Sequence, residues 1–361
     1  MASDRLPKLT NRMQRYPPTT DRSLTVFSSA DRLLIEWANQ AASPTTETLV
    51  VHDRFGGVAL SLAGPVRFVS TYHSQETALS LNVTTQEVPV TRILDTLPLF
   101  TRAVLRLPKS LSLLDFYLHR LSTVARPGAA LAIAFMTRHF TPRVLEIAGR
   151  YAERVTQTRA RQKARLLILE DVRDGGGEQP PPNTVSYGSR TYRQLPGVFS
   201  AQGVDRATAF LLEHWPEMAP PATILDVACG NGIIGDQLLQ RYPTARLMAT
   251  DDSLLAVHSA RMNLDPGRST IWFDHTLRPI PAASQDLVVT NPPFHFGHEN
   301  NIDVTLGLFR QSRECLRPGG NLVVVANRHL NYATHLQRLF GSVEAVADSG
   351  KFVIYRCTAV S

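Results

Sequence analysis

The chain has 361 residues, of which 43% are hydrophobic and 19% are charged, and its formal net charge is +7. This length is enough for two domains that each bury a core, and no apolar stretch is long enough to predict a membrane span. The three cysteines form no C-x-x-C pair and the N-terminus does not resemble a secretory signal, so we expect a cytoplasmic protein without a metal site or a disulfide framework.

The basic residues are concentrated in the first half of the chain. Residues 1–175 hold 23 Lys and Arg against 15 Asp and Glu, whereas the rest of the chain holds 15 against 16. An excess confined to one half is typical of a surface that binds a polyanion. A solvated face without a partner would have the same composition, so charge alone does not decide between the two.

The end of the first half contains the clearest domain boundary. Residues 141–167 are basic and have a helix-like pattern, and RLLILE (165–170) has the composition of a buried strand. The next segment, DVRDGGGEQPPPNT (171–184), contains three glycines followed by three prolines, which cannot continue a helix or a central strand. We therefore expect a first domain over residues 1–174, a linker over 175–188 and a second domain over 189–361.

Strands and helices alternate in the second half, after a short hairpin within 184–200 and a helix over 205–214. The expected strands are TILDVA (223–228), ARLMATD (245–251), STIWFD (269–274), DLVVTN (286–291) and NLVVVAN (321–327), and the expected helices span 233–242 and 253–264, the latter capped by Ser253. This alternation predicts an α/β fold with a parallel sheet that is covered on both faces. Ligands of such sheets bind at the carboxyl ends of the strands. The polar residues at or near those ends are Asp226, Asp251, Asp274 and Asn291.

A weak repeat relates the two halves. RPGAALAIAFMTRHF (126–140) resembles RPGGNLVVVANRHL (317–330), and TLVVHDRFGG (48–57) resembles ILDVACGNG (224–232). LPKSL (107–111) takes the place of NPPFH (291–295). In the first copy Phe55 interrupts the glycine loop, no acid matches Asp251, and Pro108–Lys109 replaces the Asn-Pro-Pro run. We infer a duplicated domain whose first copy is degenerate, with chance similarity between two α/β domains as the alternative.

The glycine-rich loop in ILDVACGNGIIG (224–235) connects a strand to a helix whose first N–H groups are free to bind a ligand. The turn residues Gly230, Asn231 and Gly232 are the candidates for contact with that ligand. The glycines of this segment also match G-x-G-x-x-G, with Asp251 about twenty residues further on. The loop alone is therefore compatible with NAD as well as with S-adenosylmethionine.

The acidic residues around the loop favour S-adenosylmethionine. A carboxylate at Asp226 would repel a pyrophosphate and attract the cationic amino group of a methionine. Asp251 can accept hydrogen bonds from both hydroxyls of a ribose in either cofactor. Asp274 can accept from an adenine amino group, although an ordinary turn aspartate would also fit this position.

NPPFHFG (291–297) ends a strand and is the most specific motif of the chain. An exocyclic amine of a base is a poor nucleophile because its lone pair is delocalised into the ring. The Asn291 amide oxygen and the Pro292 carbonyl can accept its hydrogens and direct the lone pair at an electrophile, while the prolines fix the backbone. Phe294 offers a face for an extruded base, a contact worth roughly 1–3 kcal/mol. The rate would then come from in-line positioning of donor and amine.

Two plainer interpretations of this segment remain open. The motif could be a proline turn after a buried strand, with Phe294 in the core. His295 and His298 have no third ligand nearby in the sequence, so we expect no metal site there.

DVACGNG, NPPF and FVIYRC resemble the corresponding segments of the bacterial ribosomal RNA guanine-N2 methyltransferases, the group with a "methyltransferase small" domain. The resemblance covers nearly the whole chain, and QRYPPTTD and LPKSLSLL are more similar to the member that acts on large-subunit (23S) RNA than to the small-subunit (16S) member. It implies two tandem Rossmann-like class I methyltransferase domains, the N-terminal one degenerate. It also implies methyl transfer from S-adenosylmethionine to the 2-amino group of a guanine in ribosomal RNA.

The resemblance also implies roles for the motif residues. Asp226, Gly230 and Gly232 would line the methionine end of the donor, Asp251 would hold its ribose and Asp274 its adenine. Asn291, Pro292 and Phe294 would hold the guanine. The chain departs from the family at Ala228, where members usually have glycine, and the extra methyl group is expected to crowd the loop slightly.

The basic first half then has an expected role in binding ribosomal RNA or a ribosomal subunit, through Arg159, Arg161 and Lys163 on the predicted helix. We expect a monomer without a membrane partner. The alternatives are a 16S rather than a 23S rRNA substrate, a non-catalytic RNA-binding factor in ribosome assembly, and an NAD-dependent oxidoreductase, for which the sequence shows no hydride-transfer constellation.

Overall fold

The computed structural model describes residues 13–18, 25–40, 42, 45–83, 87–175, 181–200, 202–292, 295–296, 299–300 and 302–360, and at 295–296 and 299–300 the description covers the backbone alone. The chain divides into two compact units, residues 1–181 and 182–361. Each unit contains one seven-stranded sheet. Within the described ranges, every helix is too short or too polar to cross a lipid bilayer.

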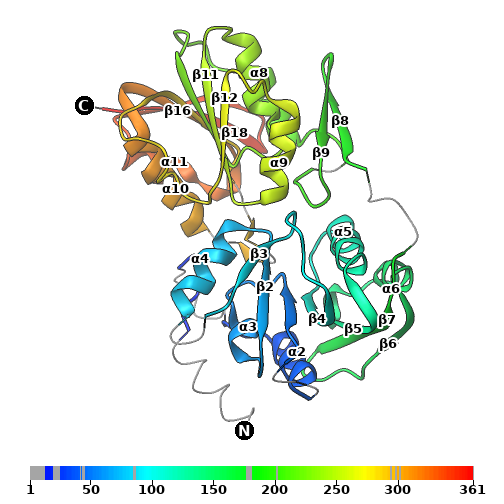
Figure 1. Cartoon of the computed structure of the whole chain (residues 1–361). Helices are drawn as coiled ribbons and strands as arrows, with labels where there is room; N and C mark the ends of the chain where they lie inside the picture. Colours follow the sequence, from blue (N-terminus) through cyan, green and yellow to red (C-terminus); the bar gives the residue numbers. More distant parts are fainter. Residues whose placement is uncertain are drawn as a thin grey trace. The chain divides into compact units, whose positions relative to one another are not determined.

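The N-terminal unit is a sheet with the strand order β3-β2-β1-β4-β5-β7-β6 (Figure 1). Its strands are β1 (Thr48–Val51), β2 (Val66–Ser70), β3 (Val90–Arg92), β4 (Phe100–Arg106), β5 (Ala125–Met136), β6 (Ala152–Gln157) and β7 (Ala164–Val172). Its helices are α2 (Ser29–Gln40), α3 (Gly57–Ser61), α4 (His73–Asn82), α5 (Leu111–Ser122) and α6 (Pro142–Gly149), with a 3₁₀ turn η1 (Thr137–His139).

The C-terminal unit has the sheet order β12-β11-β10-β13-β16-β18-β17. Its strands are β10 (Thr223–Val227), β11 (Arg246–Asp251), β12 (Ser269–Phe273), β13 (Gln285–Thr290), β16 (Leu316–Asn327), β17 (Ser342–Asp348) and β18 (Phe352–Thr358). Its helices are α7 (Arg206–Glu213), α8 (Ile233–Arg241), α9 (Leu254–Asn263), α10 (Ile302–Cys315) and α11 (Tyr332–Gln337), with a 3₁₀ turn η2 (Arg328–Leu330). Two small pairs of strands, β8 (Asn183–Tyr187) with β9 (Arg190–Gln194) and β14 (His295–Phe296) with β15 (Glu299–Asn300), lie outside this sheet.

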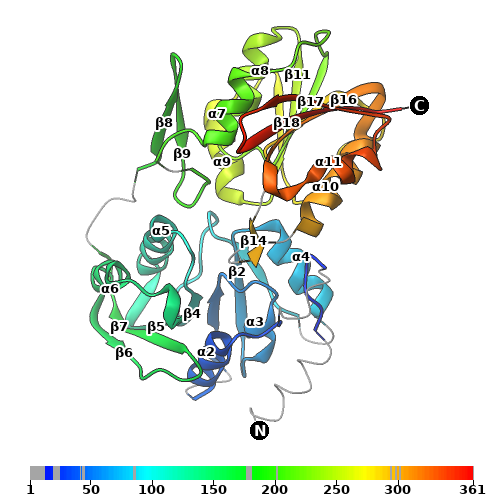
Figure 2. The ribbon, with the colours of Figure 1, turned by 180° about the vertical axis from the view of Figure 1, so that it is seen from behind.

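The two faces of the C-terminal sheet bury separate apolar clusters. Leu211 of α7, Leu238 of α8 and Ala260 of α9 pack on one face. Phe309 of α10 and Leu336 of α11 pack on the other, and the ribbon shows these helices on opposite sides of the strands (Figure 2). Burial on both faces explains why the strands consist of nearly continuous apolar residues.

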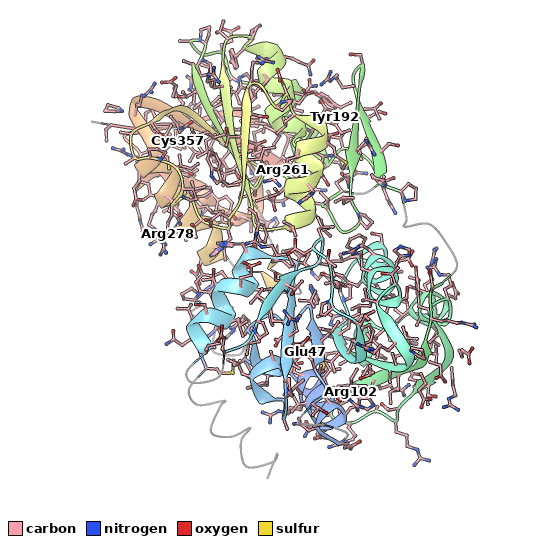
Figure 3. All side chains as sticks on the ribbon, viewed as in Figure 1. Glu47, Arg102, Tyr192, Arg261, Arg278 and Cys357 are labelled. Atoms are coloured by element: carbon pink, nitrogen blue, oxygen red, sulfur yellow. The ribbon has the colours of Figure 1, made fainter. Side chains whose placement is uncertain are left out.

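The hairpin of β8 and β9 is attached to helix α8 by polar contacts. Tyr192 of β9, labelled in Figure 3, is buried and its hydroxyl donates to Asp236 Oδ2 at 2.7 Å. Arg190 forms a salt bridge of 2.8 Å with the same carboxylate. The predicted hairpin within 184–200 is confirmed, and its first strand begins inside the predicted linker.

The predicted duplication is confirmed by the topology, because both sheets have the same strand order when β1 is matched to β10. The turns after these two strands also match. His52 and Ala228 both have a left-handed backbone, with φ of 59° and 57°. Gly56 and Gly232 cap the following helices with φ of 76° and 83°.

The sheet register corrects one detail of the predicted repeat. Val51 pairs with Leu105, and Val227 pairs with Thr290. Arg106 therefore stands where the second copy has Asn291, so LPKSL is displaced by one residue from the alignment that the sequence suggested. The same register places Val50 and Ser70 at the positions of Asp226 and Asp251, which confirms that no acid of the first copy matches Asp251.

The predicted basic helix over residues 141–167 is wrong beyond Gly149. Residues 152–157 form strand β6, which pairs with β7 at the edge of the sheet (Figure 1). The exposed positions of an edge strand carry charged side chains, so charge and partial amphipathicity do not distinguish it from a surface helix. β-branched Val155 and Thr156 favour the strand once β7 is beside them.

The five strands predicted in the second half, which are β10 to β13 and β16, are parallel as expected. The two strands that were not predicted there, β17 and β18, join the sheet in antiparallel orientation. β5 pairs antiparallel with β7, and β6 pairs antiparallel with β7; the corresponding strands of the second unit do the same. Short connections such as residues 158–163 can join only antiparallel neighbours, because a parallel neighbour needs a crossover of a dozen residues or more.

Candidate active site

Four of the predicted site residues stand at one edge of the C-terminal sheet. Strand β10 lies between β11 and β13, all three parallel. Asp226 is the penultimate residue of β10, Asp251 ends β11, and Asn291 follows β13. The backbone N–H of Asp274, just after β12, donates to the Asp251 carbonyl at 3.1 Å. Carboxylates and an amide thus gather where parallel sheets bind their ligands.

The glycines in and just after the loop between β10 and α8 are required for different structural reasons. Gly230 has φ of 57°, and a Cβ added to it would meet no atom within 4 Å, so one side of this residue is open. Gly232 has φ of 83°, and a Cβ there would lie 3.0 Å from Leu264 Cγ. A Cβ on Gly235 would lie 2.6 Å from Leu247 Cδ2. Gly230 therefore leaves room for a ligand, whereas Gly232 and Gly235 serve the packing of the loop and helix.

Ala228 also has a positive φ, of 57°, which disfavours any L-residue with a side chain. The departure from glycine at this position therefore strains the backbone, a cost that could not be inferred without the φ angle.

The Asn231 side chain is nearly buried and is used within the protein. Its Oδ1 accepts from the Ile233 N–H at 3.2 Å, and its Nδ2 donates to Gln194 Oε1 at 2.9 Å. The side chain thus fixes the loop shape, and any contact with a ligand would come from the backbone.

Asp226 is fully buried beneath the loop. Its Oδ2 accepts from the Gly235 N–H at 3.0 Å, while its Oδ1 has no hydrogen-bond partner in the described part of the chain. Burial raises the pKa of Asp226 to about 7, against the lowering effect of the Gly235 bond, and the Asp251 carboxylate adds to the rise. A buried acceptor without a donor is costly, and a cationic ligand group would satisfy it.

Asp251 and Asp274 are each held by backbone donors. Asp251 Oδ2 accepts from the Gly230 N–H at 2.9 Å, and its Oδ1 accepts from the Ser253 N–H at 2.8 Å. Burial raises the pKa of Asp251. Asp274 Oδ1 accepts from both the N–H and the hydroxyl of Thr276, at 2.7 and 2.9 Å. Each carboxylate oxygen can accept two hydrogen bonds, so such a carboxylate can still receive a ribose or adenine donor.

The Asn291 amide is oriented by two acceptors. Its Nδ2 donates to Asp205 Oδ2 and to Thr208 Oγ1, each at 3.0 Å. Its Oδ1 is buried and has no partner among the described residues. The next residue, Pro292, is also buried. Phe294 and His298 lie outside the described residues, and for His295 only the backbone is described.

Sequence reasoning missed three residues that organise the site. Asp205 and Thr208 lie at the start of α7, 86 and 83 positions before the asparagine that they bind. Gln194, at the end of β9, is buried and holds Asn231. The helix over 205–214 was expected, and Asp205 is a typical N-cap, but its second contact depends on the tertiary fold.

The three basic candidates for RNA binding lie in the other unit, on the turn between β6 and β7. Arg159, Arg161 and Lys163 are all exposed. Arg161 forms an ion pair with Glu36 at 2.6 Å. The turn is at the carboxyl edge of that sheet, because Met136 at the end of β5 pairs with Ala164 at the start of β7.

Comparison with protein families matches both halves of the chain. The model described as methyltransferase small domain matches residues 189–356, and the model described as RLMG N-terminal domain matches residues 1–173. Ribosomal RNA large subunit methyltransferase G of Stutzerimonas stutzeri is 32% identical over 358 residues, covering 95% of this chain and 95% of the relative. The protein of the same name from Pseudomonas fluorescens is 33% identical over 363 residues, covering 95% of this chain and 96% of the relative.

Among solved structures, the chain is similar to the T. thermophilus 16S rRNA N2 methyltransferase RsmC in complex with AdoMet and guanosine. The TM-score is 0.78 at 20% sequence identity, over 98% of this chain and 99% of that one. At this identity the likeness establishes the fold, which is that of two tandem α/β domains.

Proposed function

The chain belongs to the ribosomal RNA large subunit methyltransferase G family, and from that premise we propose that it methylates the exocyclic N2 amine of a guanine in 23S ribosomal RNA with S-adenosylmethionine as donor. One observation carries the assignment of the active site. At the end of β13, beside the loop where the donor would bind, the Asn291 amide presents an acceptor that has no hydrogen-bond partner among the described residues.

The residues of the β10–α8 loop fit such a donor. Within the described part of the chain, the buried Oδ1 of Asp226 has no hydrogen-bond donor and one side of Gly230 is open. We propose that Asp226 faces the methionine end, with the loop backbone at Gly230, Asn231 and Gly232, and that Asp251 and Asp274 accept from the ribose and the adenine. The bound donor supplies an electrophilic methyl group, which requires no metal ligand and no covalent bond to the protein.

The acceptor half of the site directs the nitrogen lone pair. Asn291 Oδ1 and the Pro292 carbonyl would accept hydrogen bonds from the two N–H groups of the guanine amine, so that the nitrogen approaches tetrahedral geometry and its lone pair points at the methyl group. Phe294 is proposed to stack on the extruded base. Positioning of this kind is worth several kcal/mol because the reacting atoms are held in line.

Methylation in vitro tests this proposal. We expect the protein to methylate 23S rRNA from a strain that lacks the gene, with N2-methylguanine identified by mass spectrometry, and Asn291→Ala to lower kcat by roughly 10²–10³. The matched control is Asn321→Ala, which removes the same group at the opposite edge of the sheet. Methylation of 16S rRNA instead would support the small-subunit alternative, and donor binding without methylation of either RNA would support a non-catalytic assembly factor.

We further propose that residues 1–174 bind the RNA and that residues 189–361 catalyse the transfer. Exposed ion pairs such as Arg161–Glu36 are worth less than about 1 kcal/mol, so phosphates can displace the glutamate. The same edge is basic near His139, whose pKa is lowered by burial and by the charges of Arg138, Arg106 and Lys109. A positive edge of this kind positions RNA through its phosphates.

Charge reversal tests the RNA-binding edge. Arg159→Glu/Lys163→Glu should weaken RNA binding in fluorescence anisotropy. The slope of the logarithm of the binding constant against the logarithm of the salt concentration should become shallower by about 0.7–0.9 for each lost phosphate contact. The control is Arg126→Glu/Arg173→Glu, the same charge change at the amino edge of that sheet. Equal losses of RNA affinity in both variants would refute the proposal that RNA binds specifically at the carboxyl edge of the sheet. We also propose a cytoplasmic monomer, which light scattering and cell fractionation can check.

A further inference from the structure

The carboxylate of Asp205 connects the start of helix α7 to the amide at the end of strand β13. Its Oδ2 accepts from the N–H groups of Ala207 and Thr208 at 3.0 and 3.1 Å, as an N-cap does. The same oxygen accepts from Asn291 Nδ2 at 3.0 Å. The Thr208 hydroxyl accepts from that Nδ2 as well, also at 3.0 Å. One short segment therefore supplies both acceptors for the amide nitrogen.

This arrangement determines which way the amide faces. The oxygen and nitrogen of an asparagine side chain are nearly the same size, so packing alone does not distinguish its two orientations. An ionised carboxylate can only accept, so the nitrogen must face Asp205. A reversed amide would bring Oδ1 against the carboxylate oxygen and would lose the hydrogen bond to Asp205. The Thr208 hydroxyl can accept or donate, so it supports the amide but does not by itself select the orientation. The observed orientation leaves Oδ1, without a partner among the described residues, as the atom available to a substrate.

We propose that Asp205 and Thr208 are positioning residues that hold Asn291 with its oxygen toward the substrate amine. This inference rests on the proposed function, because it assumes that Asn291 Oδ1 accepts from the guanine amine. In the reversed orientation the amide would present N–H groups to an amine that also offers N–H groups. A donor facing a donor cannot draw the nitrogen toward tetrahedral geometry, so the reversed form is inactive.

Asp205 can fix the orientation of the Asn291 amide because its own carboxylate is held at the start of a helix. The backbone N–H groups of α7 hold the carboxylate in place, and the helix packs through Leu211 into the apolar cluster of the sheet. The orientation of Asn291 is therefore fixed by an ordered helix before substrate arrives. Preorganised acceptors cost no rearrangement at the moment of reaction.

The test separates positioning from capping. Asp205→Ser keeps an N-cap hydroxyl but removes the carboxylate, and Thr208→Val removes the hydroxyl with little change of shape. We expect the double variant Asp205→Ser/Thr208→Val to lower kcat by roughly 10–100-fold, as loss of supporting hydrogen bonds typically does. Donor affinity in calorimetry and KM for RNA should change by less than about threefold, because in the proposed function the amide contacts the guanine amine and neither the donor nor the RNA backbone.

Three further variants make the result decisive. Thr208→Ser restores the hydroxyl and should recover most of the activity lost in Thr208→Val, a rescue that a merely structural role does not predict. Ser110→Ala removes the N-cap of α5 in the other unit and measures the cost of losing a cap alone. Thr208→Val by itself, with an expected loss of roughly 3–10-fold, replaces the double variant if that protein does not fold.

The outcomes distinguish this inference from the proposed function. If Asn291→Ala abolishes methylation while the double variant keeps the wild-type kcat within about twofold, Asp205 and Thr208 do not position the amide and the inference is wrong. If Asn291→Ala itself methylates normally, the proposed function of the site fails first. Equal loss of kcat and of donor affinity in the double variant would also overturn the inference, because it would indicate a collapsed site.

Discussion

Replacing Ala228 by glycine should stabilise the C-terminal unit. The residue has φ of 57°, in the left-handed region that costs an L-residue roughly 1–2 kcal/mol and glycine almost nothing. Glycine also lowers stability by roughly 0.5–1 kcal/mol, because an unfolded chain with glycine has more conformations to lose on folding. The net expectation for Ala228→Gly is an increase of about 0.5–1 kcal/mol in the free energy of unfolding.

Thermal unfolding can resolve an effect of this size. For a unit of this length, 1 kcal/mol shifts Tm by roughly 2–4 °C, so we expect a rise of about 1–4 °C. The control is Ala256→Gly inside helix α9 of the same unit, which should lower stability by about 1 kcal/mol or more. Donor affinity should stay within about twofold, because the strain is the same with and without donor. A Tm that falls in both variants would refute the strain argument, and tighter donor binding would support crowding by the methyl group.

Two further predictions concern the donor side of the site. Because folding raises the pKa of Asp226 from 3.8 to about 7, the folded state holds an extra proton between these values, and stability should fall as pH rises through 7. Donor binding needs the charged form of Asp226, so donor affinity should weaken below about pH 7. Asp226→Asn should reduce the pH dependence of the free energy of unfolding, measured in urea, and of donor affinity, measured by calorimetry. The reduction should be partial, since burial also raises the pKa of Asp251. Gly232→Ala should lower Tm more than Gly230→Ala, since only the former brings a Cβ within 3.0 Å of Leu264. Gly230→Ala should weaken donor binding more, and the opposite order would contradict the roles given to the two glycines.

The central strands could be predicted because burial on both faces leaves a strong sequence signal. Leu287, Val288 and Val289 form an uninterrupted apolar run in β13, and all three are buried. Strand β6 could not be predicted in this way, because its exposed charges resemble those of a surface helix and only pairing with β7 decides its conformation. The one-residue error at Arg106 has a similar origin, since sequence similarity between short loops does not fix sheet register.

The site was predictable where a residue follows a strand and unpredictable where it depends on a distant element. Asp226, Asp251 and Asn291 are located by the strands that precede them, which are visible in the sequence. The two acceptors that orient Asn291 come from a helix more than 80 positions earlier. Asp205 shows a capping signal, but nothing in the local sequence indicates a second use of its carboxylate. The proposed roles of these residues stay predictions until the variants are measured.

The matched turns of the two sheets separate architecture from chemistry. His52 and Gly56 have nearly the same φ angles as Ala228 and Gly232, although Val50 and Ser70 replace the acids in the first copy. The shape of this turn is therefore a requirement of joining a strand to a helix, and it is kept although both carboxylates at the strand ends are lost. The first copy has a different carboxylate, Asp53 within the turn, whose Oδ2 accepts from the Ala59 N–H at 3.0 Å. A glycine-rich loop between a strand and a helix is therefore weak evidence for a nucleotide-binding site. Under the proposed function, the two copies differ in a few side chains at the ends of their strands, which can be exchanged while the sheet and its turns keep their structure.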